Sequence, residues 1–391
     1  MFEMRERPVR RPLPQKLYVY AEWTKVRVGI DYHVEVEGHY YSVPHQYVRE
    51  QVDVRLFGGE DAAKGRGTLD GNADALDFHQ AYFAVDNLFG TAFRLKVGRQ
   101  ELAYGNQRLV GSVGWSNVGR TFDAAVAAYR TDAVSVDVFT AQLQGSTVNT
   151  FSQNLHGLYS TFRLAEAHLA DAFVLLDDNR DVVADGPEAG SKKFQRYTLG
   201  AYLHGKPAPF DYALEAVYQS GKMALADAQE RASIGAYLVS GALGFTVHKA
   251  KKLRIGAHYT RLSGDDNPAD GAARTFNTLF ATNHKFYGFM DYFPRTFSPY
   301  GLQDVALSVG LNPTPALGLK VDLHHFASER GIDTTGQQAL GQEIDLSVKY
   351  KYNDSFSLAA GASFFLADEV MKPVIGNDTA SWFYLMSVVN F

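Results

Sequence analysis

The chain has 391 residues, and 38 lysines and arginines against 43 aspartates and glutamates give a formal net charge of −5. It contains no cysteine, which excludes disulfides and cysteine-ligated metal sites, and no apolar run approaches the ~20 residues of a membrane-spanning helix. The mean hydropathy of −0.20 is close to neutral although 13% of residues are aromatic, as expected where residues alternate between lipid and water.

The N-terminal part, residues 1–57, differs from the rest of the chain. Residues 1–8 are charged and end in Pro8, and no apolar stretch of the kind that signal peptides have follows them. A barrel protein must first cross the inner membrane, so the sequence leaves the export of this chain unexplained. Residues 26–36 and 52–56 alternate between apolar and polar side chains, which is typical of β-strands.

Strand-like segments recur from about residue 75 to the C-terminus. In the clearest of them, Tyr197 and Leu199 share one face, whereas Arg196 and Thr198 share the other. The polar faces carry charges of both signs together with glycine, serine and histidine, as expected of side chains that line a water-filled lumen. The sequence therefore predicts an all-β fold, a large antiparallel transmembrane β-barrel of about 16–18 strands.

Two kinds of connection separate these segments. Short turns are expected at residues 204–207, 312–315 and 352–355, and longer polar loops near residues 101–119, 179–192, 262–300, 328–340 and 367–378. Membrane barrels have short turns at the periplasmic end and long loops at the extracellular end, so we assign the two sets accordingly. The last segment ends in Phe391, a terminal aromatic that resembles the signal recognised by the barrel assembly machinery.

Closure of the barrel leads to an expectation about the N-terminal part. The segments beyond residue 75 number about fifteen, whereas single-chain bacterial barrels have an even number of strands. An unpaired strand edge in lipid leaves backbone groups without hydrogen bonds. We therefore expect residues 50–57 to join the barrel wall, residues 25–43 to contain strand, and residues 1–22 to remain irregular.

Two stretches of sequence resemble one known family. The first combines DFHQAY at residues 77–82, VGRQELAYGNQRLVG at residues 97–111 and WSNVGRTFD at residues 115–123. The second lies within residues 264–291 and ends NHKFYGFMD. Both look like the alginate-export porin family, and the resemblance covers about residues 58–391. It implies an outer-membrane barrel of about eighteen strands with a cation-rich constriction, and passive passage of an anionic polysaccharide or a related anionic solute. A porin for small solutes unrelated to alginate is the alternative.

Residues 1–55 instead resemble the C-terminal part of the large transposase of IstA-type insertion sequences, chiefly through YHVEVEGHYYSVP at residues 32–44. The resemblance implies a hybrid with two parts, a transposase-like segment over residues 1–57 and a porin barrel over residues 58–391. The acidic catalytic core of such transposases is not in this segment, so neither nuclease chemistry nor a nucleic-acid partner is expected. A non-functional hybrid and DNA binding through the N-terminal segment are the alternatives.

A channel for an anionic polymer needs cations on the wall of a narrow wet pore, and the planar guanidinium of arginine suits carboxylates. The first motif supplies Arg99, Arg108 and Arg120, and we expect the neighbouring Asp123 to hold Arg120 in place. Alternation along the strands adds four cations, for which plain solvation in the lumen is an equal alternative: Arg94, Lys96, Arg196 and Arg254.

The direction of two side chains stays open in the sequence. Arg99 has the parity of the apolar residue Val97, so either a bulge at Gly98 turns it inward or it lies beyond the membrane band. Trp115 and the loop around it either fold inward as a constriction or cap the barrel from outside.

No set of residues indicates an enzyme, a cofactor or a metal. We interpret three histidines that are scattered singly on polar faces as ordinary lumen residues: His79, His258 and His324. An acidic loop with Asp265, Asp266 and Asp270 either binds calcium or only meets water. A barrel hydrolase is the enzyme alternative, but no serine–histidine pair and no G-x-S-x-G turn stand out. Beside the solute, the expected partners are the lipids of the outer membrane.

Overall fold

The structure is a computed structural model that describes residues 21–27, 33–36, 39–42, 51–57, 79–116, 119–143, 153–179, 182–183, 190–191, 193–224, 231–267, 269–296, 298–332 and 336–389. In this part of the chain, one sheet contains 16 strands. One of them, β17 (Ala272–Ala273), lies off the path through the sheet and pairs only with part of β15 (Arg231–His248). The other 16 − 1 = 15 strands agree with the segments expected beyond residue 75.

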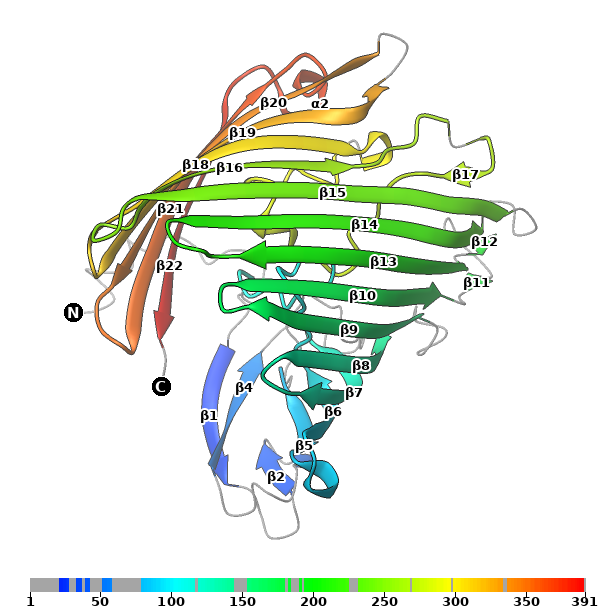
Figure 1. Cartoon of the computed structure of the whole chain (residues 1–391), viewed down its shortest axis with the longest axis vertical. Helices are drawn as coiled ribbons and strands as arrows, with labels where there is room; N and C mark the ends of the chain where they lie inside the picture. Colours follow the sequence, from blue (N-terminus) through cyan, green and yellow to red (C-terminus); the bar gives the residue numbers. More distant parts are fainter. Residues whose placement is uncertain are drawn as a thin grey trace, which may run out of the picture.

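The remaining strands of the path are β5 (Ala81–Val85), β6 (Phe93–Gln100), β7 (Phe122–Arg130), β8 (Val134–Leu143), β9 (Gln153–Ala165), β10 (His168–Asn179), β13 (Phe194–Gly205), β14 (Phe210–Ala224), β16 (Leu253–Leu262), β18 (Leu302–Thr314), β19 (Leu317–Ile332), β20 (Gln337–Lys351), β21 (Phe356–Ala367) and β22 (Ala380–Val389). The connections contain η3 (Leu88–Gly90), β11 (Val182–Val183), β12 (Gly190–Ser191), η4 (Asn283–Lys285), η5 (Ser298–Tyr300) and α2 (Lys372–Ile375). Each strand pairs antiparallel with the next on the path, and Figure 1 shows the curved wall that results.

The wall is apolar outside and polar inside. Leu199 on β13 stands opposite Tyr218 on β14, and these side chains are 47% and 51% exposed. The next pair, Thr198 and Gln219, is fully buried. A soluble sheet would bury its apolar face, whereas this sheet exposes it and buries the polar one, which is the pattern of a wall between lipid and a filled lumen. The predicted transmembrane β-barrel is confirmed.

The connections differ at the two ends of the strands (Figure 1). Residues 166–167 and 206–209 form short turns at one end, whereas residues 101–121 and 263–301 are long loops at the other. The loop expected over residues 328–340 is wrong for most of its length, because β19 and β20 run through this range up to Ile332 and from Gln337. Shifts in register between the two strands interrupt the alternation and conceal them in the sequence.

The N-terminal part forms two small sheets of its own. β1 (Ala21–Arg27) pairs with β4 (Gln51–Phe57), and β2 (His33–Val36) pairs with β3 (His39–Ser42). Strand was expected within residues 25–43 and is confirmed there, although the alternating run from residue 26 to residue 36 is divided between β1 and β2. Figure 1 shows β1 and β4 in blue beneath β9.

The expectation that residues 50–57 join the barrel wall is wrong for the part of the chain that the structure describes. β4 has β1 on one edge and no partner among the strands of the large sheet. Pairing with β1 occupies one edge of β4 along its whole length, and no described strand pairs with its other edge. Two other expectations concern the irregular chain at the N-terminus and the terminal aromatic Phe391. Residues 1–20 and Phe391 lie outside the described residues.

The apolar core lies between the inner wall and the two long loops. Phe122, at the start of β7, packs edge-on against Phe280 with ring centroids 5.8 Å apart. Phe293 packs against Phe326 of β19 at 4.5 Å, and all four side chains are buried. Both loops therefore fold into the barrel as part of its core. Within the described residues, no helix combines the length and the apolar character needed to cross a membrane.

Candidate functional site

Two loops meet inside the barrel: the first lumen loop, residues 101–121, and the second lumen loop, residues 263–301. Gly111 N–H donates to the carbonyl of Phe280 at 2.9 Å, and Phe280 N–H donates to Leu109 at 2.8 Å. One step further along, Thr282 N–H donates to the carbonyl of Gln107 at 3.0 Å. The two family-like sequence stretches thus lie side by side, and together they narrow the lumen.

Trp115 shows that the first lumen loop folds inward. Its ring stacks on His284 of the second lumen loop at 4.2 Å and meets Tyr384 of β22 edge-on at 4.7 Å. Of the two directions that the sequence left open, the structure has the inward one. The contact ties both loops to the last strand of the wall.

Arg108 links the first lumen loop to the wall. Its Nε donates to the carboxylate of Glu215 on β14 at 2.8 Å, and the two side chains are buried. A second guanidinium nitrogen donates to Ser240 on β15 at 3.2 Å, and the guanidinium carbon lies 4.0 Å from the ring centre of Phe286. Asn106 donates to the same oxygen of Glu215 at 2.9 Å. The charge of Arg108 is therefore compensated locally.

Arg120 has a different environment. Its guanidinium donates to the backbone carbonyls of Phe280 and of Ala281, the latter at 3.2 Å. Burial, and after it the nearby positive charge of Arg295, lowers the pKa of Arg120 to about 10. At neutral pH the group stays charged, and no carboxylate among the described residues forms an ion pair with it. The expectation that Asp123 holds Arg120 is wrong, because Asp123 binds another arginine.

That arginine is Arg99, which donates to the two oxygens of Asp123 at 3.0 and 3.3 Å. The two residues are directly opposite on β6 and β7, so both side chains lie on the same side of the sheet. Asp123 alternates with the buried residues Phe122 and Ala124 and belongs to the outer face. The register of β6 runs through Gly98 without a shift, so no bulge turns Arg99 into the lumen. The expectation of Arg99 at a constriction is wrong.

The four cations expected from alternation also have partners. Arg196 lies 3.1 Å from Asp177 on β10, and Arg254 lies 2.6 Å from Asp211 on β14. Near the short-turn end of β6, Arg94 lies 3.2 Å from Asp86, and the ammonium of Lys96 lies 3.7 Å from the ring centre of Tyr82. Three of the four cations have a carboxylate partner, and Lys96 has an aromatic one. This pattern is typical of a solvated wall and not of a ring of free cations.

Two cavities lie beside the lumen loops. The larger, of about 1550 Å³, is lined by Arg120, Arg196, Arg295 and Trp115, and the smaller, of about 270 Å³, by Arg108, Arg254 and Lys285. Lys285 donates to the carbonyl of Asn106 at 3.0 Å. Burial, and after it Arg108, lowers the pKa of the Lys285 ammonium.

Sequence reasoning did not single out Lys285 and Arg295. Both belong to the second lumen loop, where no strand alternation indicates which side chains face the lumen. Within the described residues, neither Lys285 nor Arg295 forms an ion pair with a carboxylate. The same holds for Arg120. The position of Lys285 inside the second family-like stretch was the one signal that pointed to it.

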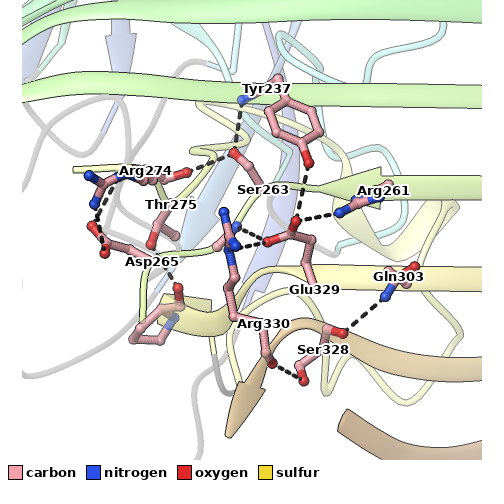
Figure 2. Close-up of polar contacts among 12 residues, drawn as sticks. Tyr237, Arg261, Ser263, Asp265, Arg274, Thr275, Gln303, Ser328, Glu329 and Arg330 are labelled. Atoms are coloured by element: carbon pink, nitrogen blue, oxygen red, sulfur yellow. Dashed lines mark hydrogen bonds and ion pairs between the residues drawn. The ribbon is translucent and has the colours of Figure 1, made fainter. Parts of the chain in front are cut away.

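The second lumen loop is anchored at its start by Glu329 of β19 (Figure 2). One carboxylate oxygen accepts from Arg261 at 2.6 Å and from the hydroxyl of Tyr237 at 3.1 Å, and the other accepts from Gly264 N–H at 3.0 Å. Glu329 is buried. A carboxylate with this many donors fixes the point where the loop leaves the wall.

In the acidic loop at the start of the second lumen loop, Arg274 forms ion pairs with the aspartates. Arg274 lies 2.8 Å from Asp270 and 3.6 Å from Asp265. The carboxylate of Asp265 also accepts from the backbone N–H groups of Asn267 and Arg274, at 3.1 and 3.0 Å. Arg274 thus pairs with two of the three carboxylates, and backbone N–H groups also bind Asp265, which leaves no open set of oxygens that supports calcium there.

The histidines are not scattered singly, as the sequence suggested. His79 lies 2.8 Å from Glu101. His258 and His324 both contact Asp304, each at 2.9 Å. They are far apart in the sequence, and the pairing of β16, β18 and β19 brings them together.

Comparison with known proteins places the chain in a family. The family model described as alginate export matches residues 25–381. This range includes residues 25–57, which the sequence indicated as part of a transposase-like segment, so the boundary between the two parts stays a prediction.

Curated relatives match a smaller portion. The chain is 40% identical over 88 residues to the transposase y4uI of Sinorhizobium fredii, and 45% identical over 87 residues to a transposase of insertion sequence IS408 of Burkholderia multivorans. Each match covers 20% of this chain and 17% of the relative. The chain thus spans less than a fifth of the length of these transposases.

Solved structures of outer-membrane porins share the fold. Acinetobacter baumannii OccAB4 has a TM-score of 0.52 and 10% identity, with 87% of this chain and 74% of that chain covered. Pseudomonas aeruginosa OccK5 (OpdH) has a TM-score of 0.53 and 10% identity, with 87% and 86% covered. At this identity the likeness concerns the fold alone.

Proposed function

The chain belongs to the alginate export family, and we propose that it forms an outer-membrane channel through which an anionic polysaccharide or a related anionic solute passes passively. The barrel wall, with its apolar exterior and polar lumen, supports a channel in the outer membrane. Neither the sequence nor the lumen suggests a catalytic role.

One observation carries the preference for anions: three of the cations that line the two cavities beside the lumen loops lack a carboxylate partner within the described residues. These cations are Arg120 and Arg295 at the larger cavity and Lys285 at the smaller one. The other arginines on these two cavities, Arg108, Arg196 and Arg254, each form an ion pair with a wall carboxylate. The three cations raise the local potential beside the paired loops, although Asp265, Asp266 and Asp291 also line the larger cavity and the whole chain is acidic.

The placement of these cations suits passage of a polyanion. Carboxylates of a polyuronate would meet Arg120 and Arg295 in one cavity and Lys285 in the next, on the two sides of the paired loops. Conduction requires several weak sites in series instead of one tight site. The carbonyl contacts of Arg120 hold its guanidinium in position without neutralising its charge, so the charge stays available to a solute.

Reversal potentials across a planar bilayer in a salt gradient test this proposal. We expect anion selectivity for the purified chain, and a shift toward cation selectivity in the double variant Arg120→Gln/Arg295→Gln. Arg99→Gln is the matched control, because it removes an arginine of the same motif from the outer face. Cation selectivity of the unchanged protein, or equal shifts in the variant and the control, would contradict the proposal.

Blockade experiments separate a polysaccharide channel from a porin for small solutes. Oligouronates added to one side should reduce the current at concentrations where neutral oligosaccharides of the same length do not. Equal effects of the two would favour the small-solute alternative.

We also propose that the N-terminal part derives from an insertion-sequence transposase of the IstA type joined to a porin gene near residue 57. The transposase matches over about a fifth of the chain support a fusion, and the separate β1–β4 sheet is consistent with a foreign segment. The genomic DNA upstream of Met1 tests it. An insertion element that reads into this frame supports the hybrid, and an uninterrupted porin gene contradicts it.

Assembly by the barrel machinery through Phe391 belongs to the same proposal. β22, which ends at Val389 two residues before the terminal aromatic, pairs with β21 on one edge. Deletion of Phe391 should lower the amount of heat-modifiable barrel in the outer membrane, and an unchanged amount would contradict this role.

A further inference from the structure

The inner wall carries two imidazoles and a carboxylate that converge from three neighbouring strands. His258 on β16 and His324 on β19 stand in register with the same residue of β18, Ala306, and Asp304 lies two residues away on that strand. His258 Nε2 is 2.9 Å from one oxygen of Asp304, and His324 Nδ1 is 2.9 Å from the other. The three candidate ligand atoms all lie within 4.8 Å of one another.

We propose that His258, Asp304 and His324 form a binding site for a divalent transition-metal ion of the zinc type. Two imidazole nitrogens and one carboxylate oxygen are the ligand set that such ions prefer, while calcium and magnesium prefer oxygen alone. Ligands about 2.0–2.2 Å from a tetrahedral ion are about 3.3 Å apart. Small side-chain rotations reach this arrangement from the separations seen here, without movement of the paired strands.

The surroundings of His324 hold its ring as metal-ligating imidazoles are usually held. Its other nitrogen, Nε2, faces a carboxylate oxygen of Asp345 at 3.9 Å. Asp345 accepts from the hydroxyl of Ser363 at 2.5 Å, and the ring of His324 stacks on Phe326 at 5.2 Å. At 3.9 Å the two groups do not form a hydrogen bond, but the negative charge of Asp345 on the side of Nε2 favours a proton there and a lone pair on Nδ1.

The site also has an open side. His258 and His324 line the cavity of about 270 Å³, together with Arg254, Lys320 and Asp322. Asp304 lies behind them and is fully buried. Three protein ligands with a fourth position toward a wet cavity are the arrangement of an accessible metal site, where water or an anion completes the coordination. A structural site would instead enclose the ion with four protein ligands.

Metal binding would replace contacts that the metal-free chain makes. The two imidazoles lie at hydrogen-bond distance from Asp304. The charged groups that face the pair from neighbouring strands are Asp322, Asp345, Lys320 and Arg254, and the carboxylates among them favour a cation. This site does not depend on the solute that the channel carries.

Titration of the purified, untagged full chain in detergent tests the site. After treatment with a chelator, we expect one equivalent of ZnCl₂ to bind by calorimetry, and CoCl₂ to give the visible absorption of a site with nitrogen ligands. Affinity should fall at least about tenfold in His324→Ala and in His258→Ala.

His204→Ala is the matched control. His204 also lies on the inner wall beside a buried aspartate, Asp171 at 3.7 Å, but without a second histidine. Heat-modifiable migration in gels reports whether each variant folds. If His324→Ala does not fold, the binding measured for His258→Ala tests the site. The His258 side chain is more exposed, so its removal should disturb folding less. No binding by the unchanged chain, or equal binding by all variants, would overturn the proposal.

Discussion

The guanidinium of Arg108 in the first lumen loop lies 2.8 Å from the carboxylate of Glu215 on β14, and both side chains are buried. This contact joins residues that are 107 positions apart. It fixes the loop to the wall, and it also removes one of the expected pore cations from contact with the solute.

Removal of one partner of this pair should lower the free energy of unfolding more than removal of both partners does. Glu215→Gln leaves a buried guanidinium without its counter-charge, and we expect a loss of about 3–5 kcal/mol in the free energy of unfolding. The double variant Arg108→Met/Glu215→Leu should lose less, because no charge remains buried. Denaturant-induced unfolding followed by heat-modifiable migration measures both, and an additive double variant would contradict the coupling.

Anion selectivity should weaken when the pH rises through about 10, the pKa to which burial and Arg295 lower Arg120. The folded chain releases this proton at a lower pH than the unfolded chain does, since the usual value is 12.5. The titration therefore does not reduce stability, and the change in selectivity does not reflect unfolding. Reversal potentials across this range should shift less in Arg120→Gln. An identical pH profile in the variant would show that another group is responsible.

The anchor at Glu329 should control the order of the second lumen loop. Glu329→Gln weakens charge-assisted contacts with Arg261 and Gly264, each of which contributes about 1.5–3 kcal/mol. We expect faster proteolysis within residues 263–301 and larger fluctuations of the single-channel current. Glu369→Gln is the control, because among the described residues that exposed carboxylate pairs with Lys372 of its own connection and with no residue of the lumen loops. Equal proteolysis of the two variants would refute the anchor.

The N-terminal fragment of residues 1–57 should neither cut nor join DNA. Two-metal strand transfer needs an acidic cluster that this segment does not contain, and the transposase matches cover only 17% of those relatives. A strand-transfer assay with magnesium or manganese measures this directly. Retention on a DNA column that falls with salt would instead indicate binding without chemistry.

The sequence by itself determined the class of fold and most of its order. Alternation with period two, as in Tyr197 and Leu199 against Arg196 and Thr198, is a local property of strands and needs no tertiary information. It indicated the fifteen strands beyond residue 75. It failed between Ser328 and Leu340, because register shifts change the parity inside paired strands.

The tertiary structure alone decided which charged side chains are free. Arg99, Arg108 and Arg120 lie within one motif. The first binds Asp123 on the outer face, the second binds Glu215 inside, and the third has carbonyl groups and no carboxylate as hydrogen-bond acceptors among the described residues. Likewise His258 and His324 meet at Asp304 through strand pairing. Compensation of a charge depends on the residues that long-range pairing brings within a few ångströms, and a pattern that is local in sequence does not contain that information.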